Sequence, residues 1–282
     1  MVIVKLYGGL GNQMFQYAVG RTLSLKNKDV LKFDLSWFDD TGDDINRPFK
    51  LSVFNIDINE ADKERVNKIV PGRIRRILGL YDHKEYIKEK HFNFDEEVIN
   101  LKGDVYLDGY WQSWKYFSDV EDVIKEDFTL KNGFGEESNK IADIIKNNNS
   151  VSLHVRRGDY VQNVKTNAYH GTCSMEYYKK AIEYIKNKVG DIKLFIFSDD
   201  IAWAKEQELF KGSVFVSRSE IKDYEEMILM SLCEHNIVAN SSFSWWGAWL
   251  NRNNNKIVIA PKRWFNIPKD TSDLIPNDWV RV

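Results

Sequence analysis

Two arginines, a histidine and an aspartate are concentrated in one short segment of the chain. His154, Arg156, Arg157 and Asp159 lie at and just beyond the carboxyl end of the apolar run 151–155, which has the character of a buried strand. The planar guanidinium of arginine binds phosphate oxygens in bidentate fashion and stays charged in a partly dry pocket. The segment therefore indicates a site for a phosphate-bearing ligand. The alternative is a structural Arg–Asp pair at a domain edge.

Two adjacent carboxylates, Asp199 and Asp200, follow a second apolar run at 193–197. A carboxylate at a strand end can accept hydrogen bonds from ribose hydroxyls or from the N–H groups of a purine, and an aspartate there also suits the N-cap of the next helix. Both interpretations stay open, including one aspartate in each role. Because the two are adjacent, they do not form the Asp-x-Asp pair that holds a divalent ion, and Asp39-Asp40 and Asp43-Asp44 match it no better.

Small hydroxyl side chains gather at a third strand end. Ser241, Ser242 and Ser244 lie with Phe243 between a short apolar run and the helical segment 245–251. A helix N-terminus presents unpaired N–H groups and the positive end of the helix dipole, so it binds anions. We expect phosphate contact at these serines rather than helix capping alone, and we assign the tryptophans of this segment to the core.

A glycine loop, Gly8-Gly9-Leu10-Gly11-Asn12-Gln13, follows the alternating run 2–7. It departs from the dinucleotide pattern G-x-G-x-x-G because Met14 stands where the last glycine is required, and it lacks the Gly-Lys-Ser/Thr ending of a P-loop. It does allow close backbone approach to a ligand, and its amide side chains can face a cleft. The four segments together predict a diphosphate-bearing nucleotide, held in the second half of the chain against this loop from the first.

The elements that must position these residues alternate regularly in the second half. Strands are predicted at 151–155, 193–197, 214–216, 237–239 and 256–260, and helices at 175–188, 201–210, 224–234 and 245–251. Ser174 is placed to cap the first of these helices, and Asp223 with Glu226 forms a D-x-x-E capping box at the third. Strict alternation implies a mostly parallel sheet covered on both faces, which binds ligands beyond the carboxyl ends of its strands.

The first half is less regular. We expect a strand at 2–7 followed by a helix that Asn12 caps, a strand at 105–111, and a helix at 62–80 that Pro71-Gly72 interrupts. A polar stretch at 133–150, with a helix at 137–146, marks the domain boundary. The prediction is an N-terminal acceptor-side domain at 1–140 and a C-terminal domain at 150–282, whose final segment can pack back on the first.

Composition limits the classes of protein. The chain has 282 residues, of which 43% are hydrophobic, so a sizeable core is expected and global disorder is not. The 40 basic and 42 acidic side chains nearly balance, which argues against a dedicated nucleic-acid binder. Two cysteines, Cys173 and Cys233, are too few for a disulfide scaffold and are expected to be free thiols.

No apolar run approaches the 18 residues of a membrane-spanning helix, and the first residues predict a strand rather than a signal peptide. We therefore expect a cytoplasmic protein, with peripheral contact at the inner membrane left open. The basic cluster Arg73, Arg75 and Arg76 fits either a solvated face or contact with an anionic membrane or a lipid-diphosphate carrier.

The chemistry-bearing segments together resemble the bacterial α-1,2-fucosyltransferases, members of the glycosyltransferase family that includes the blood-group H enzymes. The matching motifs are GGLGNQMFQYA (8–18), HVRRGDY (154–160), FSDD (197–200) and NSSFSWWGAWL (240–250). The His-x-Arg-Arg-x-Asp block alone is shared with α-1,6- and protein O-fucosyltransferases, whereas its combination with the two long motifs is highly specific. Residues 34–100 carry no matching motif, and we expect acceptor choice to lie there.

The resemblance implies an α/β fold of GT-B architecture, with two Rossmann-like domains facing a cleft and GDP-β-L-fucose held by the C-terminal one. It implies inverting transfer of L-fucose, with no metal or other cofactor, to the 2-hydroxyl of a terminal galactose. The acceptor would be a galactose-terminated oligosaccharide or lipid-linked glycan of a surface polysaccharide such as O-antigen. A fucosyltransferase of other linkage or with a protein acceptor, and a non-catalytic nucleotide-sugar-binding protein, remain alternatives.

The resemblance also implies roles for single residues. Arg156 matches the arginine on the donor diphosphate, and Arg157 is its neighbour in the motif. The nucleoside is read at His154 and Asp199 or Asp200, the β-phosphate is held at Ser241, Ser242, Phe243 and Ser244, and Gly9, Gly11 and Asn12 face the donor sugar.

Arg156, Asn12 and Asp159 are the predicted catalytic residues. Negative charge builds on the leaving phosphate, and Arg156 with the helix N-terminus at 242–244 would stabilise it. Asp159 is the candidate general base for the acceptor hydroxyl, with a salt bridge to Arg157 as its alternative role.

Overall fold

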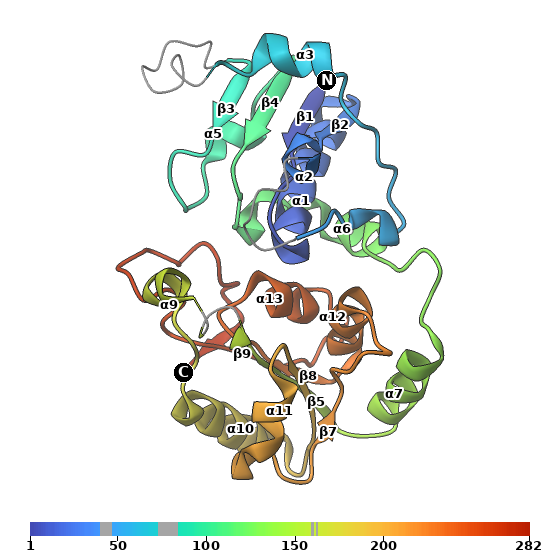
Figure 1. The fold of residues 1–282 in the computed structure, drawn as a ribbon, viewed down its shortest axis with the longest axis vertical. Coiled ribbons are helices and arrows are strands. Elements are labelled where there is room, and N and C mark those ends of the chain that lie inside the picture. Colours follow the sequence, from blue (N-terminus) through green and yellow to red (C-terminus); the bar gives the residue numbers. More distant parts are fainter. Residues whose placement is uncertain (40–46, 73–83, 159–160, 162) are drawn as a thin grey trace. The chain divides into compact units, whose positions relative to one another are not determined.

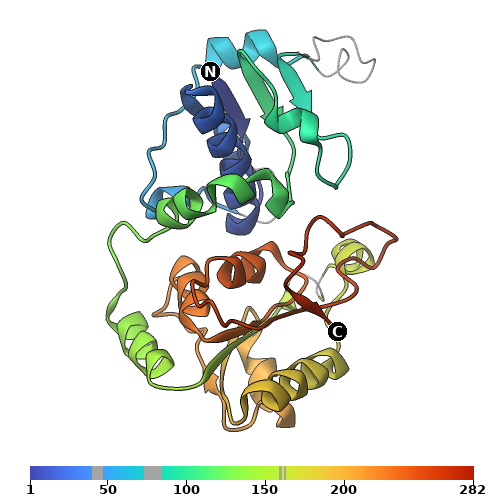
Figure 2. The same ribbon diagram turned by 180° about the vertical axis from the view of Figure 1, so that it is seen from behind.

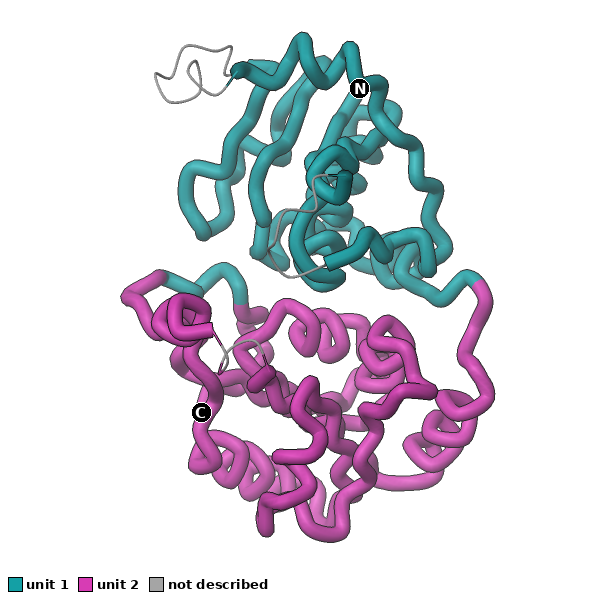
Figure 3. Tube along the Cα trace, in the orientation of Figure 1, with its two compact units in different colours: residues 1–131, 270–274 teal, residues 132–269, 275–282 magenta. Residues whose placement is uncertain are grey.

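The chain divides into two compact units (Figure 3). The structure is a computed structural model that describes residues 1–39, 47–72, 84–158, 161 and 163–282. Unit 1 comprises residues 1–131 and 270–274, and unit 2 comprises residues 132–269 and 275–282. The helix expected at 137–146 forms α7 (Glu136–Lys146), which belongs to unit 2.

Unit 1 is built on a parallel sheet with the strand order β2-β1-β4-β3 (Figure 1). Its strands are β1 Val2–Lys5, β2 Leu31–Asp34, β3 Tyr86–Lys88 and β4 Val105–Asp108, and its α-helices are α1 Leu10–Asn27, α2 Ser36–Asp39, α3 Lys63–Ile69, α5 Glu96–Ile99 and α6 Glu121–Asp127. The sequence predicted β1 and β4 but missed β2 and β3. Those two strands have only four and three residues, so each is too short for its residue pattern to mark a strand in the sequence alone.

Helix α1 packs closely on this sheet because Gly20 has no side chain. A Cβ at Gly20 would lie 2.4 Å from Val4 Cγ2 and 2.9 Å from Leu31 Cδ1. The prediction that Asn12 caps this helix is wrong, since the N-cap is Gly9 and the Asn12 N–H donates to the Gly9 carbonyl at 2.9 Å. The helix begins earlier than expected because two glycines allow the chain to turn directly after β1.

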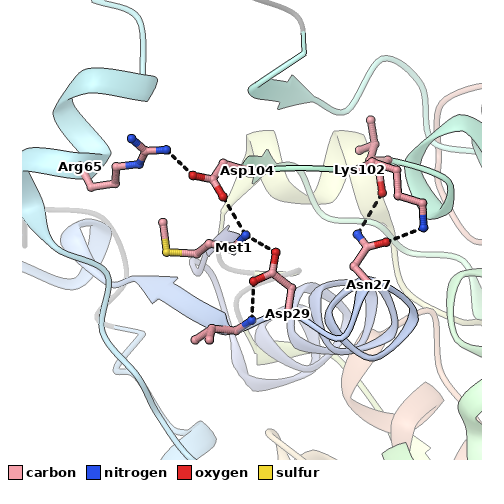
Figure 4. A network of polar contacts seen from close by, with 8 residues as sticks. Met1, Asn27, Asp29, Arg65, Lys102 and Asp104 are labelled. Carbon is pink, nitrogen blue, oxygen red and sulfur yellow. Dashed lines mark hydrogen bonds and ion pairs between the residues drawn. The ribbon is translucent and has the colours of Figure 1, made fainter.

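The chain's first amino group is bound by carboxylates at the amino end of this sheet (Figure 4). The Met1 nitrogen donates to Asp29 and to Asp104 Oδ1, the latter at 2.8 Å, and Arg65 pairs with the other oxygen of Asp104. Burial lowers the pKa of this amino group, but the hydrogen bonds and charges of the two aspartates outweigh burial and raise it above its usual value. The network joins the start of β1 to the segments that precede β2 and β4.

Unit 2 is built on a larger parallel sheet with the order β10-β9-β8-β5-β6-β7. Its strands are β5 Ser150–Val155, β6 Lys193–Ser198, β7 Val214–Phe215, β8 His235–Ile237, β9 Val258–Ala260 and β10 Val280–Arg281. Its other α-helices are α9 Val164–His170, α10 Met175–Val189, α11 Ile201–Glu206, α12 Asp223–Leu232 and α13 Ser242–Trp249. The predicted strand–helix alternation is confirmed, and β10 and α9 are elements that the sequence did not predict.

Helices cover both faces of the unit 2 sheet (Figures 1 and 2). In β6, Ile196 packs in the cluster that includes Ile182 of α10, whereas Phe195 and Phe197 pack in the cluster that includes Leu229 of α12. Successive side chains along a strand point to opposite faces of the sheet, so α10 and α12 cover different faces. Every residue of β5 is buried, as expected of a central parallel strand.

Helix caps in unit 2 follow the sequence in one case and depart from it in another. Ser174 caps α10, with its hydroxyl oxygen accepting from the Tyr177 N–H at 3.2 Å, as predicted. The predicted Asp223/Glu226 box is wrong by one residue. Glu225 accepts from the Lys222 N–H at 3.0 Å, because α12 begins at Asp223 and its third residue is the one that reaches back.

Two sequence expectations concern the chain as a whole. Cys173 and Cys233 are both free thiols, as predicted. Within the described ranges, no helix is long and apolar enough to span a lipid bilayer.

Candidate active site

Parallel pairing brings the arginine and aspartate motifs of unit 2 together. β5 pairs with β6 in the register Val155↔Ser198, so Arg156 and Asp199 each lie one residue beyond the end of paired strands. Arg156 Nη1 lies 3.2 Å from Asp199 Oδ2. The Arg157 backbone N–H donates to Asp199 Oδ1 at 2.9 Å. Asp199 therefore holds both the side chain of one arginine and the backbone of the next.

The second aspartate has a different role. Asp200 Oδ1 accepts from the Trp203 N–H at 3.2 Å and so caps α11, and its Oδ2 lies 3.5 Å from Arg157 Nε. Helix capping is thus one of the two interpretations that the sequence left open. Gly158 allows the close approach of Asp199, because a Cβ at Gly158 would lie 2.7 Å from Asp199 Oδ2.

The two arginines differ in their surroundings. The Arg157 guanidinium lies 4.0 Å from the ring centroid of Trp203, in a cation–π contact, and also pairs with Asp200. Arg156 pairs with Asp199 through Nη1, and 19% of its side chain is exposed. A guanidinium carries five N–H donors, so one that a carboxylate orients at one edge can still meet phosphate oxygens at another. Each arginine thus pairs with one aspartate, and Arg157 also stacks on Trp203.

His154 is buried within β5 and close to the third motif. Burial, with the charge of Arg156 as a second cause, lowers the pKa of His154 to about 3, so the ring is neutral at physiological pH. Its Nδ1 has no hydrogen-bond partner among the described residues, and its ring centroid lies 5.6 Å from that of Phe243. A neutral imidazole can exchange hydrogen bonds with a nucleoside but supplies no positive charge to a diphosphate.

The serines that precede and open α13 are not equivalent. Ser241 is the N-cap, and its hydroxyl oxygen accepts from the Phe243 N–H at 3.3 Å. The Ser244 hydroxyl is buried and accepts from the Ala239 N–H at 3.2 Å. Ser242 and Phe243 are partly exposed. The first turn of α13 and Ser242 therefore present the accessible groups of this motif, while Ser241 and Ser244 stabilise the turn.

The glycine loop of unit 1 is ordered by amide side chains. Gln13 is fully buried and donates to the carbonyls of Gly8 and Pro48 at 2.9 and 3.0 Å. Asn12 Oδ1 accepts from Gln112 Nε2 at 2.8 Å. Gln13 thus maintains the loop from within, whereas Asn12 is oriented by a residue that follows β4.

An arginine that the sequence did not single out lies against this loop. A Cβ at Gly9 would be 2.8 Å from Arg47 Nη1, so the glycine leaves room for the guanidinium, and Gly11 is buried in α1. Arg47 and Gln112 lie far from the loop in the chain, and no local pattern marks either of them. Only the folded unit brings this cation and this amide beside Gly9 and Asn12.

The whole chain, residues 1–282, matches the family model described as glycosyl transferase family 11. The chain belongs to glycosyltransferase family 11. Among similar proteins is an alpha-1,2-colitosyltransferase of Escherichia coli, 37% identical over 100% of this chain and 99% of the relative. Another is the O-antigen biosynthesis glycosyltransferase WbnK of Escherichia coli, 34% identical over 98% of this chain and 99% of the relative.

Animal fucosyltransferases are more distant relatives. The galactoside alpha-(1,2)-fucosyltransferase 1 of Leontocebus fuscicollis is 27% identical over 68% of this chain and 56% of the relative. The family that the motifs predicted is therefore confirmed, and this family 11 chain is a glycosyltransferase.

A solved structure with the same fold is NodZ alpha-1,6-fucosyltransferase co-crystallized with GDP. It has a TM-score of 0.51 and 14% identity, over 87% of this chain and 90% of that one. At this identity the likeness shows the fold alone. It confirms the predicted α/β, GT-B architecture of this family 11 protein.

Several predicted residues lie outside the described ranges. These are the candidate base Asp159, the acidic residues Asp40, Asp43 and Asp44, and the basic cluster Arg73, Arg75 and Arg76. Among the residues that are described, no group of three or more His, Cys, Asp or Glu side chains is arranged to hold a metal ion.

A half-buried carboxyl, Glu226, is linked through Ser217 to the end of β6, a contact that the sequence analysis missed. Glu226 Oε2 accepts from the Ser217 hydroxyl at 2.9 Å, and the Ser217 oxygen in turn accepts from the Ser198 N–H at the end of β6. Burial raises the pKa of Glu226 to about 8, although the hydrogen bond from Ser217 opposes this. The sequence had assigned Glu226 to a helix cap, a role that Glu225 takes instead.

We expect Glu226→Gln to stabilise the ligand-free protein at pH 8 more than at pH 5. The raised pKa means that, between about pH 4.5 and 8, the folded state keeps a proton that the unfolded state releases. The free energy of unfolding therefore falls as pH rises, by at most about 1.4 kcal/mol per pH unit. Glutamine resembles the protonated acid and does not titrate, so the variant should not show this fall in the free energy of unfolding.

Urea unfolding of both proteins at pH 5, 6, 7 and 8 measures the effect. The matched control is Glu208→Gln, at a side chain that is 87% exposed; this variant keeps Glu226, so its stability profile should run parallel to that of the wild type. Parallel stability profiles of wild type and Glu226→Gln would show that Glu226 is ionised in the folded protein.

Proposed function

We propose that this chain transfers L-fucose from GDP-β-L-fucose to the 2-hydroxyl of a terminal galactose, with inversion and without a metal ion. The observation that carries the proposal is the cation–anion pair at the end of β5, in a chain that matches the family 11 model over residues 1–282. Arg156 is oriented there by Asp199, and His154 in the same strand lies 5.6 Å, ring to ring, from Phe243 at the start of α13.

Two groups of unit 2 are suited to a diphosphate. Arg156 offers a permanently charged guanidinium, and the first turn of α13 offers backbone N–H groups with Ser242 beside them. A diphosphate leaving group gains negative charge as its bond to the sugar breaks. Donors that are already oriented stabilise that charge without reorganising, and such electrostatic stabilisation usually contributes more to catalysis than any other single effect.

The proposed reaction is a single displacement. The oxygen of the galactose 2-hydroxyl forms a bond to the anomeric carbon of fucose on the face opposite GDP. The bond from that carbon to the β-phosphate oxygen breaks, and its electron pair leaves with GDP. The hydroxyl proton passes to a base, for which Asp159 stays the sequence-based prediction, and Asn12 stays the predicted contact of the donor sugar.

The acceptor we propose is a galactose-terminated oligosaccharide or lipid-linked glycan of a surface polysaccharide. Support comes from the relative that is named an O-antigen biosynthesis glycosyltransferase and matches nearly the full chain. Assembly at the cytoplasmic face of a membrane, with peripheral contact, stays a prediction from the sequence.

A second donor, GDP-colitose, is favoured by the 37% identical relative named an alpha-1,2-colitosyltransferase. Colitose is L-fucose without its 3-hydroxyl. A site built to hydrogen-bond that hydroxyl rejects the deoxy sugar by about 10⁴–10⁵, whereas an apolar site discriminates against the added hydroxyl by only about 10². The ratio of rates with the two donors therefore separates the proposals.

The test is incubation of the purified protein with each GDP-sugar and a panel of β-galactosides, in parallel with and without EDTA. We expect release of GDP and a fucosyl product whose linkage, read by NMR, is α-1,2 to galactose. Any other linkage or a peptide product overturns the assignment, and a faster reaction with GDP-colitose favours the second donor. GDP binding with neither transfer nor donor hydrolysis would indicate a binding protein, and loss of activity in EDTA would overturn metal independence.

A further inference from the structure

We propose that Tyr7, Trp37 and Tyr110 form a platform on which a hexopyranose ring of the glycan acceptor stacks. We call these three side chains the aromatic platform. The inference rests on the proposed function, because it names the surface of unit 1 that would receive the acceptor of that transfer.

The aromatic platform lies at the carboxyl ends of three neighbouring parallel strands. Tyr7 follows β1, Trp37 follows β2 and Tyr110 follows β4, and these strands are adjacent in the order β2-β1-β4. The carboxyl ends of parallel strands share one edge of the sheet, and that edge is where open α/β sheets bind ligands. Side chains far apart in the sequence are thereby gathered at the functional edge of unit 1.

Tyr7 lies beside each of the other two rings, and all three side chains keep part of their surface in water. The Tyr7 ring centroid lies 4.8 Å from that of Tyr110, edge to face, and 6.4 Å from that of Trp37. Trp37 is 38% and Tyr110 41% exposed, and within the described part of unit 1 they are the exposed aromatic side chains. Single exposed aromatics are ordinary, but a cluster of them at a ligand-binding edge indicates a binding surface.

The turn that carries Tyr110 is held in an unusual conformation. Both oxygens of the Glu89 carboxylate accept backbone hydrogen bonds, from the Tyr110 N–H at 2.8 Å and the Trp111 N–H at 2.9 Å. Trp111 has φ +56, a left-handed conformation that is costly for a bulky residue. A Cβ at Gly109 would lie 2.4 Å from Glu89 Cβ, so glycine is required there.

Backbone strain of this kind is retained where a site needs one geometry. The indole Nε1 of Trp111 is also buried without a hydrogen-bond partner among the described residues. The chain thus accepts strain and an unsatisfied donor at the residue directly after Tyr110. The result is a fixed position for Tyr110 against Tyr7.

Polar groups beside the aromatic platform fit a sugar. Lys5 Nζ lies 5.6 Å from the Tyr7 ring centroid and 3.9 Å from Asp108 Oδ1, at the ends of β1 and β4. Burial, and then the charge of Asp108, raises the pKa of Tyr7 well above its usual value, so its hydroxyl stays neutral and can both donate and accept. Gln112 lies two residues beyond Tyr110 and reaches Asn12 at 2.8 Å.

A pyranose has C–H groups on one face and hydroxyls around its rim. Aromatic faces bury the C–H groups, and a few placed polar groups then fix the orientation of the ring. Tyr7 is directly followed by the glycine loop in which Asn12 is predicted to face the donor sugar. An acceptor ring on the aromatic platform would therefore lie beside that loop within the same unit.

The test combines kinetics with direct binding. With lactose as acceptor, we expect Trp37→Ala and Tyr110→Ala to raise the acceptor KM about tenfold while the donor KM and the affinity for GDP stay unchanged. Trp37→Phe should keep most of the acceptor affinity, because it retains an aromatic face. The matched control is Tyr184→Ala, a partly exposed tyrosine on α10 of unit 2, with no expected effect on either KM.

Dissociation constants for lactose, measured by NMR titration without donor, test the aromatic platform separately from the proposed sugar transfer. Loss of lactose binding in Trp37→Ala supports the aromatic platform even if the wild type transfers neither fucose nor colitose. Unchanged acceptor KM and lactose affinity in both alanine variants, or an equal rise in donor KM, overturns it. A wild-type protein that binds no galactoside overturns it as well.

Discussion

Replacing Arg156 by alanine is expected to lower the rate of sugar transfer by about 10²–10³, equivalent to about 3–4 kcal/mol of transition-state stabilisation. The reason is that Arg156 is the strand-end guanidinium that Asp199 orients at 3.2 Å. An alanine there leaves the charge on the departing phosphate without its permanent cation. Steady-state kinetics of purified Arg156→Ala, with its unfolding midpoint recorded, measure the effect.

Neighbouring variants sharpen this prediction. Arg156→Lys keeps the charge but loses the planar fork, so activity should fall less than with alanine. Arg157→Ala should lower the rate less than Arg156→Ala, because the Arg157 guanidinium is engaged by Trp203 and Asp200. Arg218→Ala is the control, since Arg218 forms an ion pair with Glu137 on the surface. Near-normal activity of Arg156→Ala would remove Arg156 from the mechanism.

Replacing Asn240 by alanine is expected to lower the free energy of unfolding by about 2–4 kcal/mol. Asn240 Nδ2 lies 2.9 Å from the His170 carbonyl and 3.1 Å from the carbonyls of Gly171 and Trp264. The side chain is 3% exposed, so these carbonyls would lose a buried donor with no water to replace it. Asn240 therefore ties the segment before α13 to two other loops of unit 2.

Urea unfolding of Asn240→Ala and Asn240→Asp tests this role. The aspartate has the same shape but sets carboxylate oxygens against carbonyl oxygens, so it should be at least as destabilising at neutral pH. Asn148→Ala is the control, because its exposed Nδ2 donates to one carbonyl, that of Ile144, and its loss should change stability by no more than about 0.5 kcal/mol. Wild-type stability of Asn240→Ala would show that the three contacts contribute nothing.

The strands of unit 2 were predictable because a buried parallel strand is a local property of the sequence. β6 contains the continuous apolar run Leu194–Phe197, and β5 alternates apolar residues with serine and histidine; their predicted bounds agree with the structure to within one residue. β2 and β3 were not predictable in this way. They become strands because β1 and β4 lie beside them, a tertiary effect that no window of the sequence contains.

The candidate site was predictable as a set of motifs but not as a set of contacts. Arginines after a buried strand and serines before a helix can bind anions because of their residue types alone, so the sequence was enough to identify them. Asp200 caps a helix because α11 begins directly after it, and the sequence alone did not fix that start. Arg157 stacks on Trp203, a residue 46 positions later in the chain, so this contact also depends on the fold.

The sequence by itself determined the family and the class of fold, and it supplied the segments at which we predict a phosphate-bearing ligand, because apolar runs, glycines and arginine clusters are encoded by consecutive residues. Only the tertiary structure decided which carboxylate orients Arg156, that burial raises the pKa of Glu226, and that Trp37 and Tyr110 both lie beside Tyr7. These depend on strand order and register, which place side chains from distant parts of the chain within a few ångströms of one another. Burial at those positions then sets their charge.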